Sequence, residues 1–327
     1  MAVALATLAI VVACGNTPGL PRAGLNTPVR GPADLTCSLP VSNGSQAGFI
    51  DFPSGKFRAD LSAPDPRTHF GLTYSFGAHR WVTTAYSYGY DLLSPDGRYF
   101  VEAQGPPMYS GSGSSNGGAT EIYLRDVNTM EARKVGSVPG RARVFAYRSD
   151  GIYLDQGAVL RFDPATGHTV TIRPKVGLPN GSTGWFWTTS DAVWGSLLPV
   201  PNQSDANPVV SMSLADGTIT EWYRSPTARS VSIVGFVKPD EPLLIEFNVE
   251  PYDHMTGIAF SLLTGRGVVK SLTLDPSISP WGVTDRVGVW LASPGRVWVY
   301  SSEGLIPMAD ISGALGDATP RPVGPCR

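Results

Sequence analysis

The sequence predicts an all-β fold, a β-propeller of four-stranded blades, with six blades as the first count and seven as the alternative. The chain contains 37 Gly and 29 Pro, and only 16% of its residues are charged, a composition typical of chains with many turns. Short segments of alternating apolar and polar residues recur along its length. No stretch keeps a helical apolar period for three turns without Gly or Pro intervening. These observations favour strands over helices.

Size and charge exclude several other classes. With 327 residues, 42% of them hydrophobic, the chain can bury a sizeable core and is not expected to be disordered. The formal net charge is -2, and Lys and Arg are scattered singly instead of forming a basic stripe. Nucleic acid is therefore not an expected partner.

The N-terminus carries an export signal. Residues 2–13 form an uncharged, mostly apolar run, which is shorter than the roughly 20 residues needed to span a bilayer but suits a signal-peptide core. The run ends in Val11, Val12, Ala13 and Cys14, and this pattern resembles the lipobox of bacterial lipoproteins. The resemblance implies that Cys14 receives lipid and becomes the mature N-terminus. We therefore expect an exported protein, anchored by lipid in the cell envelope outside the cytoplasm.

Three regions follow from this pattern. We predict a signal peptide with lipobox over 1–14, a flexible tether rich in Pro and Gly over 15–36, and the propeller domain over 37–327. Cys37 and Cys326 lie at the two ends of the predicted domain. In an oxidising compartment they are expected to form a disulfide, because a propeller brings its chain ends together. We expect the segment around Cys37 to lie beside the last outer strand, over 305–311.

Two interleaved series of turns organise the body, and each recurs about every 40 to 55 residues. The first series is Gly55, Asp96, Asp150, Asp191, Asp240 and Asp285; the second is Gly77, Asn128, Thr166, Asp216, Thr264 and Glu303. Interleaving places two hairpins, or four strands, in each of six units, which is the composition of a propeller blade. A β-sandwich is the alternative fold, but it does not explain two interleaved series.

The motif SPDGR at 94–98 resembles the first hairpin of blades in bacterial propellers of the TolB and YVTN types. This resemblance implies an envelope protein that binds a ligand or a protein. It is carried by a short turn motif and by the repeat, so it implies a function class and no specific partner.

Long loops predict where a binding site lies. In a four-stranded blade the tight turns share one face, and the connections between the second and third strands lie on the other. Long connections are expected at 62–71, 105–119 and 198–208, and together with the segment 250–256 we expect them to form a rim around one mouth of the central channel. The candidate binding residues on this rim are Asp65, His69, Tyr109, Asp205, Glu250, Tyr252, Asp253 and His254.

Motif searches do not indicate catalysis. The sequence has no HExxH, no paired Cys sets, no GxSxG and no GKS or GKT, so zinc, serine-nucleophile and phosphate-loop chemistry lose support. No metal site and no cofactor are predicted. The Trp residues suggest a carbohydrate platform at first sight, but their alternation within strands predicts packing between blades. The set considered is Trp185, Trp187, Trp194, Trp290 and Trp298.

Three functions remain open from the sequence. The first is a monomeric module that binds an envelope protein or a small ligand and meets the membrane only through its lipid. The second is a carbohydrate-active or lyase-type enzyme, and the third is a structural cell-surface module. A channel mouth with three or more carboxylates and His would favour the enzyme, and an open aromatic patch would favour the binding module.

Overall fold

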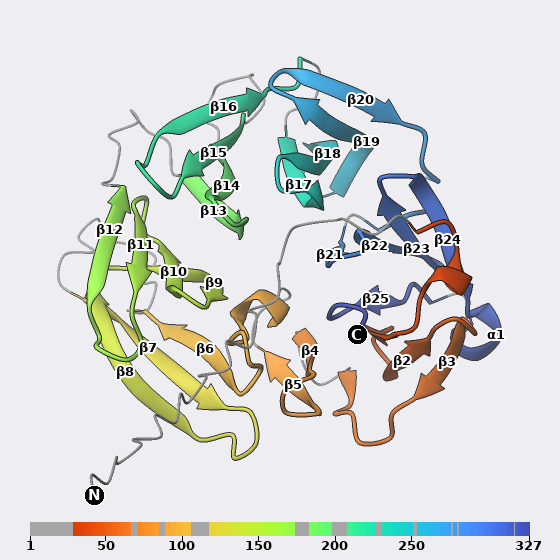
Figure 1. Ribbon diagram of the computed structural model, residues 1–327, viewed down its shortest axis with the longest axis horizontal. Coiled ribbons are helices and arrows are strands. Elements are labelled where there is room, and N and C mark those ends of the chain that lie inside the picture. The colour runs from red at the N-terminus through yellow and green to blue at the C-terminus, as the bar shows by residue number, and fades with distance from the viewer. Residues whose placement is uncertain are drawn as a thin grey trace, which may run out of the picture.

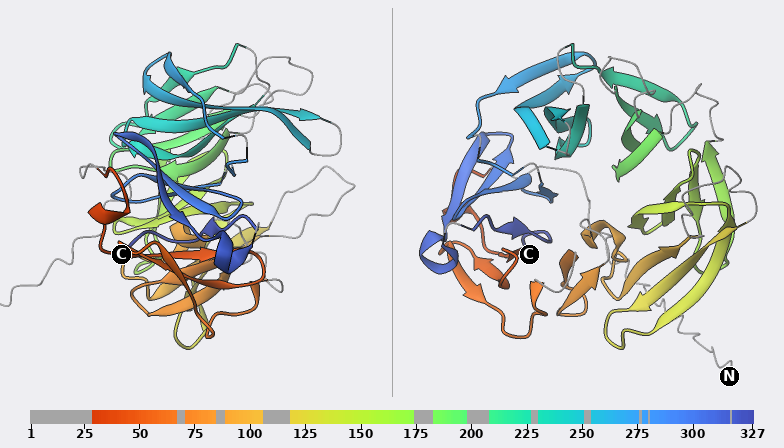
Figure 2. Two further views of the ribbon diagram at one scale, coloured as in Figure 1. Left: turned by 90° about the vertical axis from the view of Figure 1, so that its right-hand side faces the viewer. Right: turned by 180° about the vertical axis from the view of Figure 1, so that it is seen from behind.

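The computed structural model describes residues 29–66, 71–84, 89–105, 118–173, 183–197, 208–226, 230–250, 254–275, 277–279, 281–316 and 318–327. Within these ranges the strands form seven antiparallel sheets, which stand around a ring (Figure 1). In the side view, the sheets follow one another from the top to the bottom of the molecule (Figure 2). The predicted all-β propeller is confirmed.

We number the sheets as blades in chain order. Blade 1 contains β25 (Arg321–Pro322), β1 (Ser38–Ser42), β2 (Ala47–Asp51) and β3 (Lys56–Ala59). Blade 2 contains β4 (Gly71–Ser75) and β5 (Arg80–Thr84), and blade 3 contains β6 (Tyr99–Gln104), β7 (Ala119–Asp126) and β8 (Ala132–Pro139). Blade 4 contains β9 (Arg143–Arg148), β10 (Gly151–Asp155), β11 (Val159–Phe162) and β12 (Thr169–Arg173).

Each of the remaining three blades has four strands, like blades 1 and 4. Blade 5 contains β13 (Thr183–Thr188), β14 (Ala192–Leu197), β15 (Val209–Ser213) and β16 (Ile219–Tyr223). Blade 6 contains β17 (Ser230–Lys238), β18 (Glu241–Glu250), β19 (His254–Gly265) and β20 (Val268–Leu272). Blade 7 contains β21 (Val283–Thr284), β22 (Val289–Ser293), β23 (Arg296–Ser301) and β24 (Gly304–Asp310).

Short helices complete the described elements. They are η1 (Pro32–Asp34), η3 (Gly89–Leu92) and α1 (Ser312–Leu315). In the parts of the chain that the structure describes, no helix has the length and apolar character to cross a bilayer.

The blade count corrects the first predicted unit. The turn at Gly55 joins β2 to β3, the outer pair of blade 1, whereas the turn at Gly77 joins β4 to β5 in a separate sheet. The first unit is therefore divided between two sheets, and the ring has seven sheets where the first count had six. The reason is that β25, the C-terminal strand, supplies the inner strand of blade 1. The turn at Gly55 therefore joins the third and fourth strands of that blade, and not its first and second strands as predicted. In the other five units, each pair of turns falls within one sheet, as expected.

The core lies between neighbouring blades. Buried clusters combine Phe145 of blade 4 with Trp185 of blade 5, and Trp194 of blade 5 with Phe236 of blade 6. Trp185, Trp194 and Trp290 are almost fully buried, and Trp298 packs against the cluster between blades 6 and 7. The prediction that these Trp residues pack between blades is confirmed. Trp187 differs, because it also lines a cavity described below.

Blade 1 closes the ring with strands from both chain ends. β1 pairs with β25 in the register Val41↔Pro322, and the Ser38 N–H donates to the Arg327 carbonyl at 2.7 Å. The predicted disulfide between Cys37 and Cys326 is present, with a Cα–Cα distance of 5.4 Å.

The predicted neighbour of Cys37 is wrong in part. The strand after Cys37 pairs with β2 and β25 and not with β24, because it becomes the second strand of its own blade. It meets β24 only through side chains, since Cys37 shares a buried cluster with Ile306 and Met308. Val29 and Leu35, at the end of the predicted flexible tether, are buried in the same cluster. The folded body therefore includes residues that we assigned to the tether, because these two apolar side chains pack into the buried cluster around Cys37.

Asp285 of blade 7 stabilises the closure of the ring, where blade 7 meets blade 1 and the C-terminal tail. Its Oδ2 accepts hydrogen bonds from Trp290 Nε1 at 2.7 Å and from the Cys326 N–H at 2.8 Å, and its Oδ1 accepts from the Val287 N–H at 2.7 Å. Burial raises the pKa of the Asp285 carboxyl above its usual range, against the effect of these donors. Asp285 was predicted only as a turn former, yet it also ties the C-terminal tail to blade 7.

Candidate functional site

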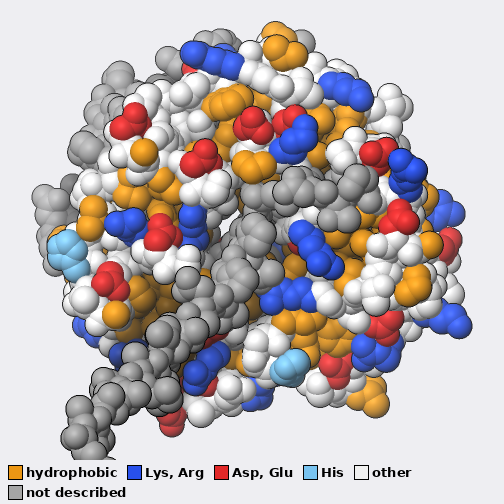
Figure 3. All heavy atoms as spheres, in the orientation of Figure 1, with side chains coloured by type: hydrophobic (Ala, Val, Ile, Leu, Met, Phe, Trp, Pro, Cys, Tyr) orange, Lys and Arg blue, Asp and Glu red, His pale blue; other side chains and the backbone are white. Residues whose placement is uncertain are grey.

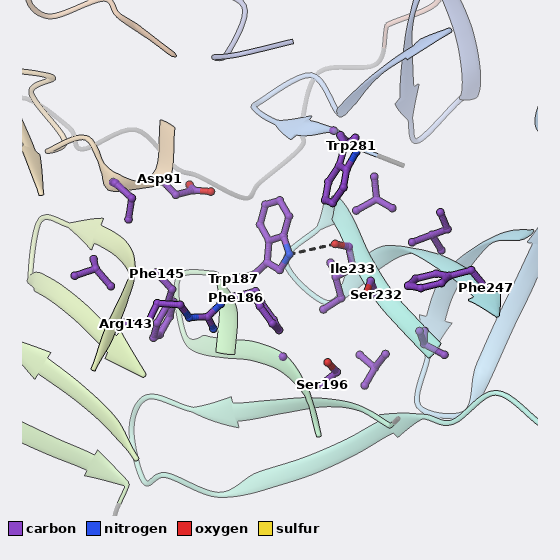
Figure 4. Close-up of a pocket in the computed structure, with 18 residues that line it drawn as sticks. Asp91, Arg143, Phe145, Phe186, Trp187, Ser196, Ser232, Ile233, Phe247 and Trp281 are labelled. Atoms are coloured by element: carbon purple, nitrogen blue, oxygen red, sulfur yellow. Dashed lines mark hydrogen bonds between the residues drawn. The ribbon is translucent and has the colours of Figure 1, made fainter. Parts of the chain in front are cut away.

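A cavity of about 280 Å³ lies at the inner ends of blades 4, 5 and 6 (Figure 4). Most of its lining is apolar, and five aromatic side chains contribute to it. The aromatic residues are Phe145, Phe186, Trp187, Phe247 and Trp281. The polar side chains are those of Asp91, Arg143, Ser196 and Ser232.

A β-bulge in blade 5 brings two successive aromatic residues to the cavity. Trp185 pairs with Gly195 and Trp187 pairs with Trp194, so Phe186 is an extra residue in β13. A regular strand would point Phe186 and Trp187 to opposite faces, whereas a bulge redirects one of them. As a result both line the cavity, while Trp185 is buried between blades 4 and 5. Phe186 is 41% exposed, which is unusual for a Phe in a propeller strand.

Trp187 is fixed against blade 6. Its Nε1 donates to the Ile233 carbonyl at 3.2 Å, and its ring meets Phe236 edge to face with centroids 6.0 Å apart. Figure 4 shows this hydrogen bond and places Trp281 on the other side of the Trp187 ring from Phe186. Trp281, which precedes β21, is 41% exposed. The two indoles therefore line the cavity, and Trp187 does so while its N–H stays hydrogen-bonded to Ile233.

Arg143 supplies positive charge at one side of the cavity. Its Nη2 donates to the Trp185 carbonyl at 2.8 Å and to Asp155 Oδ2 at 3.2 Å, and its guanidinium carbon lies 4.4 Å from the Phe186 ring centroid. Asp155 also accepts hydrogen bonds from the backbone N–H groups of Gly157 and Trp185. Burial raises the pKa of the Asp155 carboxyl, although these hydrogen bonds and Arg143 oppose the rise.

Asp91 is the acidic side chain in the cavity lining. It comes from η3, and it also lines a smaller cavity of about 50 Å³ together with Trp187 and Trp281. That second cavity extends toward β25, where Arg321 and Pro322 line it. The two spaces therefore meet at Asp91 and the two indoles.

This arrangement suits binding more than acid–base catalysis. A concave, largely aromatic lining with a few polar groups is typical of a ligand pocket. In the portion of the chain described by the structure, no group of three or more His, Cys, Asp or Glu is placed to hold a metal ion. The aromatic patch that would favour binding is found at the cavity.

Most of the predicted rim residues cannot be placed. His69, Tyr109, Asp205, Tyr252 and Asp253 lie outside the described residues, and so does Cys14, the predicted site of lipidation. Asp65 follows β3 and is not part of the cavity lining. Glu250 ends β18 and pairs with His254 at the start of β19, so the backbones of these two are brought together.

The long connections can be placed by the strands that flank them. Those at 105–119, 198–208 and 250–256 join β6 to β7, β14 to β15 and β18 to β19, which are second-to-third-strand connections as predicted. The segment 62–71 instead joins β3 of blade 1 to β4 of blade 2. The cavity includes Ser196 and Val209, close to the strand ends that 198–208 connects.

Sequence reasoning missed the residues that form the cavity. Arg143, Phe186 and Trp281 were not singled out, and Trp187 was assigned to the core. One signal was available in β13, where Trp185, Phe186 and Trp187 are consecutive. Three successive aromatic residues cannot all face one core in a regular strand, so an aromatic side chain must face elsewhere.

No protein-family model matches the chain, and no curated protein matches it. Solved structures do resemble it. A prolyl endopeptidase has a TM-score of 0.51 at 12% identity, with 84% of this chain and 50% of that chain covered. An oligogalacturonate lyase in complex with manganese has a TM-score of 0.44 at 10% identity, covering 83% and 74%. An acylaminoacyl peptidase from Pyrococcus horikoshii has a TM-score of 0.43 at 10% identity, covering 85% and 43%. The chain spans half the length of the prolyl endopeptidase, and at 12% identity the likeness to that structure shows the fold alone.

Proposed function

We propose that this protein is a binding module, a β-propeller that is anchored by lipid on Cys14 outside the cytoplasm and holds a ligand or part of an envelope protein in the cavity at blades 4, 5 and 6. The observation that carries the binding role is the cavity itself. It leaves Phe186 and Trp281, each 41% exposed, around an open space that Trp187 also lines. Aromatic surface is costly to leave exposed to water unless a partner covers it.

The resemblance to TolB-like propellers adds support at blade 3. The motif at 94–98 forms the turn between an inner bridge at Leu93 and β6, which is the first hairpin of the blade. Ser94 Oγ donates to Asp96 Oδ1 at 2.5 Å and accepts from the Tyr99 N–H at 2.9 Å. These short contacts explain why a Ser and an Asp occupy this turn, and they give Asp96 a structural role.

The surface is consistent with a small or protein ligand. Acidic and basic side chains alternate singly over the face in Figure 3, without a broad area of either sign. Binding that depended on a phosphate backbone would need a basic stripe. The proposed partners are therefore an envelope protein or a small ligand, with the membrane reached only through the lipid, and the proposed form is a monomer.

The binding role is tested by capture from envelope extracts, with a glycan array in parallel. The bait is the mature domain, compared with a Phe186→Ala, Trp281→Ala double variant. We expect the wild-type domain to retain a partner or glycan that the double variant loses. Val268→Ala is the matched control, because Val268 is 58% exposed on the outer strand β20 and should not affect binding. Binding that survives loss of both aromatic side chains would place the site elsewhere.

The anchor is tested by Cys14→Ser in the protein expressed from its native start. Wild type is expected in the membrane fraction after a salt wash, and the variant is expected in the soluble fraction, because the lipid is attached at this thiol. Cys326→Ser is the control, since it breaks the disulfide but leaves Cys14 intact. A Cys14→Ser protein that still fractionates with membranes would contradict the lipid anchor.

A further inference from the structure

Arg143 has hydrogen-bonding capacity that the protein does not use. A guanidinium carries five N–H donors. Only Nη2 donates within the described structure, to the Trp185 carbonyl and to Asp155. Nε and the two N–H groups of Nη1 donate to no acceptor among the residues that the structure describes. An arginine at the wall of a cavity therefore retains donors for another molecule.

The ion pair with Asp155 does not remove this capacity. The Asp155 side chain is 11% exposed, whereas that of Arg143 is 46% exposed and is directed from β9 toward Phe186 (Figure 4). The carboxylate is enclosed by the N–H groups of Gly157 and Trp185, so it lies behind the guanidinium and not in the cavity. Asp155 fixes the orientation of Arg143, and the Phe186 ring supports one face of the guanidinium.

The other residues that line the cavity determine which uncharged group the ligand can carry. Among the described residues that line the larger cavity, Arg143 is the only cation and Asp91 is the only carboxylate. Asp91 also lines the smaller cavity, together with Trp187 and Trp281. An anionic group is therefore attracted at Arg143, while an apolar body fits between the rings. The volume of about 280 Å³ exceeds the roughly 150 Å³ of an engineered apolar cavity that binds benzene, so a two-ring body can be held.

We propose that the cavity binds a carboxylate with a planar apolar body, the carboxylate accepting hydrogen bonds from the unused donors of Arg143 and the body packing against Phe186 and Trp187. This inference rests on the proposed binding role of the same cavity. It names the ligand class, an aromatic or similarly flat carboxylic acid, which includes the carboxylate end of a larger molecule. The charge-assisted hydrogen bond supplies the selectivity, and the rings supply apolar contact that does not depend on charge.

The test uses three probes of one shape and different charge. They are 2-naphthoate, its neutral counterpart 2-naphthamide, and the cationic 2-naphthylmethylamine, each titrated into the mature domain and followed by ligand-observed NMR. For wild type we expect 2-naphthoate to bind about 10-fold more tightly than 2-naphthamide, which is the effect of one hydrogen bond to a charged group. Arg143→Met should remove this preference while leaving the affinity for 2-naphthamide within about twofold.

Two further variants keep the test decisive if Arg143→Met folds poorly. Arg143→Lys keeps the charge but not the flat surface against Phe186, and should retain part of the preference. Arg296→Met is the matched control, because it removes a half-exposed arginine that is paired with Asp310 in blade 7 and does not line the cavity. Its preference for 2-naphthoate should equal that of wild type.

The outcomes separate the inference from the proposed function. Equal binding of 2-naphthoate and 2-naphthamide in wild type would overturn the carboxylate inference and leave the cavity as a binding site. Tighter binding of the amine than of the other two would also overturn it, and would assign the selectivity to Asp91. If none of the three probes binds, the carboxylate inference is overturned, while the proposed binding role is decided by the capture experiment with the Phe186→Ala, Trp281→Ala variant.

Discussion

Trp194 and Trp290 are almost equally buried but differ in what their indole N–H meets. Trp290 Nε1 donates to Asp285 at 2.7 Å, whereas Trp194 Nε1 is buried without an acceptor in the described part of the chain. Replacing Trp by Phe removes a similar ring volume in both cases. Only at Trp290 does it also remove a hydrogen bond and a donor to a buried carboxylate, whereas at Trp194 it removes an N–H that is costly to bury.

We therefore predict that Trp290→Phe lowers the free energy of unfolding by about 1–3 kcal/mol more than Trp194→Phe does. Urea denaturation of the two variants and wild type, with the disulfide intact, measures the difference. Equal losses would show that the Trp290–Asp285 hydrogen bond does not stabilise the closure of the ring.

The buried Asp285 also predicts a dependence of stability on pH. Burial raises its pKa above the ordinary value of 3.8, so the folded protein holds this proton to higher pH than the unfolded chain does. The contribution of Asp285 to stability is then fully present below 3.8 and declines as pH rises toward the raised native value. Asp285→Asn removes this titration. The free energy of unfolding of wild type minus that of the variant should fall with pH in this window, and a difference that rises there would contradict the prediction.

At the scale of elements, close contacts between turns fix how blades 2 and 3 meet. A Cβ added at Gly77, in the turn between β4 and β5, would lie 1.7 Å from the Asp96 carbonyl oxygen. Across the same contact, Ser75 Oγ donates to the Gly97 carbonyl at 2.5 Å. The turn must therefore carry Gly at this position, whatever the composition of the strands it joins.

Gly77→Ala is predicted to destabilise the protein by at least about 1 kcal/mol, because the backbone of one turn must move away from the other. The matched control is Gly313→Ala in α1, where an added Cβ meets nothing within 4 Å and Ala is the better helix former. Thermal unfolding of both variants should show a lower midpoint for the first only. An unchanged midpoint for Gly77→Ala would mean that this contact does not fix the two blades.

The elements also show what could be predicted and why the rest could not. Turn residues mark hairpins reliably. Asp96 and Asp216 accept hydrogen bonds from the backbone N–H groups of Arg98 and Thr218, and Asp150 lies in the turn between β9 and β10, so these positions were correct from the sequence. The cavity was not predictable in the same way, because it depends on the bulge at Phe186 and on residues far apart in the chain. Register is decided by how β13 pairs with β14, which no local pattern determines.

At the scale of the whole molecule, ring closure depends on the C-terminal tail. β25 supplies only two residues, and the Val323 N–H donates to the Pro40 carbonyl at 3.0 Å beside it. The disulfide then fixes a loop of chain with a sequence separation of 289. The pairing of Cys37 with Cys326 was predictable because propeller ends must meet. The first count was six blades, and the ring has seven sheets. Nothing in the N-terminal sequence reveals that the inner strand of blade 1 comes from the C-terminus.

Replacing both Cys37 and Cys326 by Ser is predicted to lower the free energy of unfolding by about 2–5 kcal/mol, mainly because the unfolded chain gains freedom. Deleting residues 321–327 should cost more, since it removes β25 as well as the disulfide and exposes the edge of β1. Denaturant unfolding of the two proteins, alongside wild type with and without reductant, separates the covalent link from the strand. A double Ser variant as stable as wild type would show that the disulfide does not stabilise the closed ring.

The central claim is that the cavity at blades 4, 5 and 6 is where this propeller binds, and ¹⁹F NMR of protein labelled with 5-fluorotryptophan tests it most directly. The chain has eight Trp residues, each assignable by a Trp→Phe variant. With a mixture of aromatic acids, amides and amines, the account predicts that the resonances of Trp187 and Trp281 shift, while those of the buried Trp185, Trp194 and Trp290 do not. Resonances of Trp187 and Trp281 that stay unchanged with every compound, or shifts confined to other Trp residues, would contradict it.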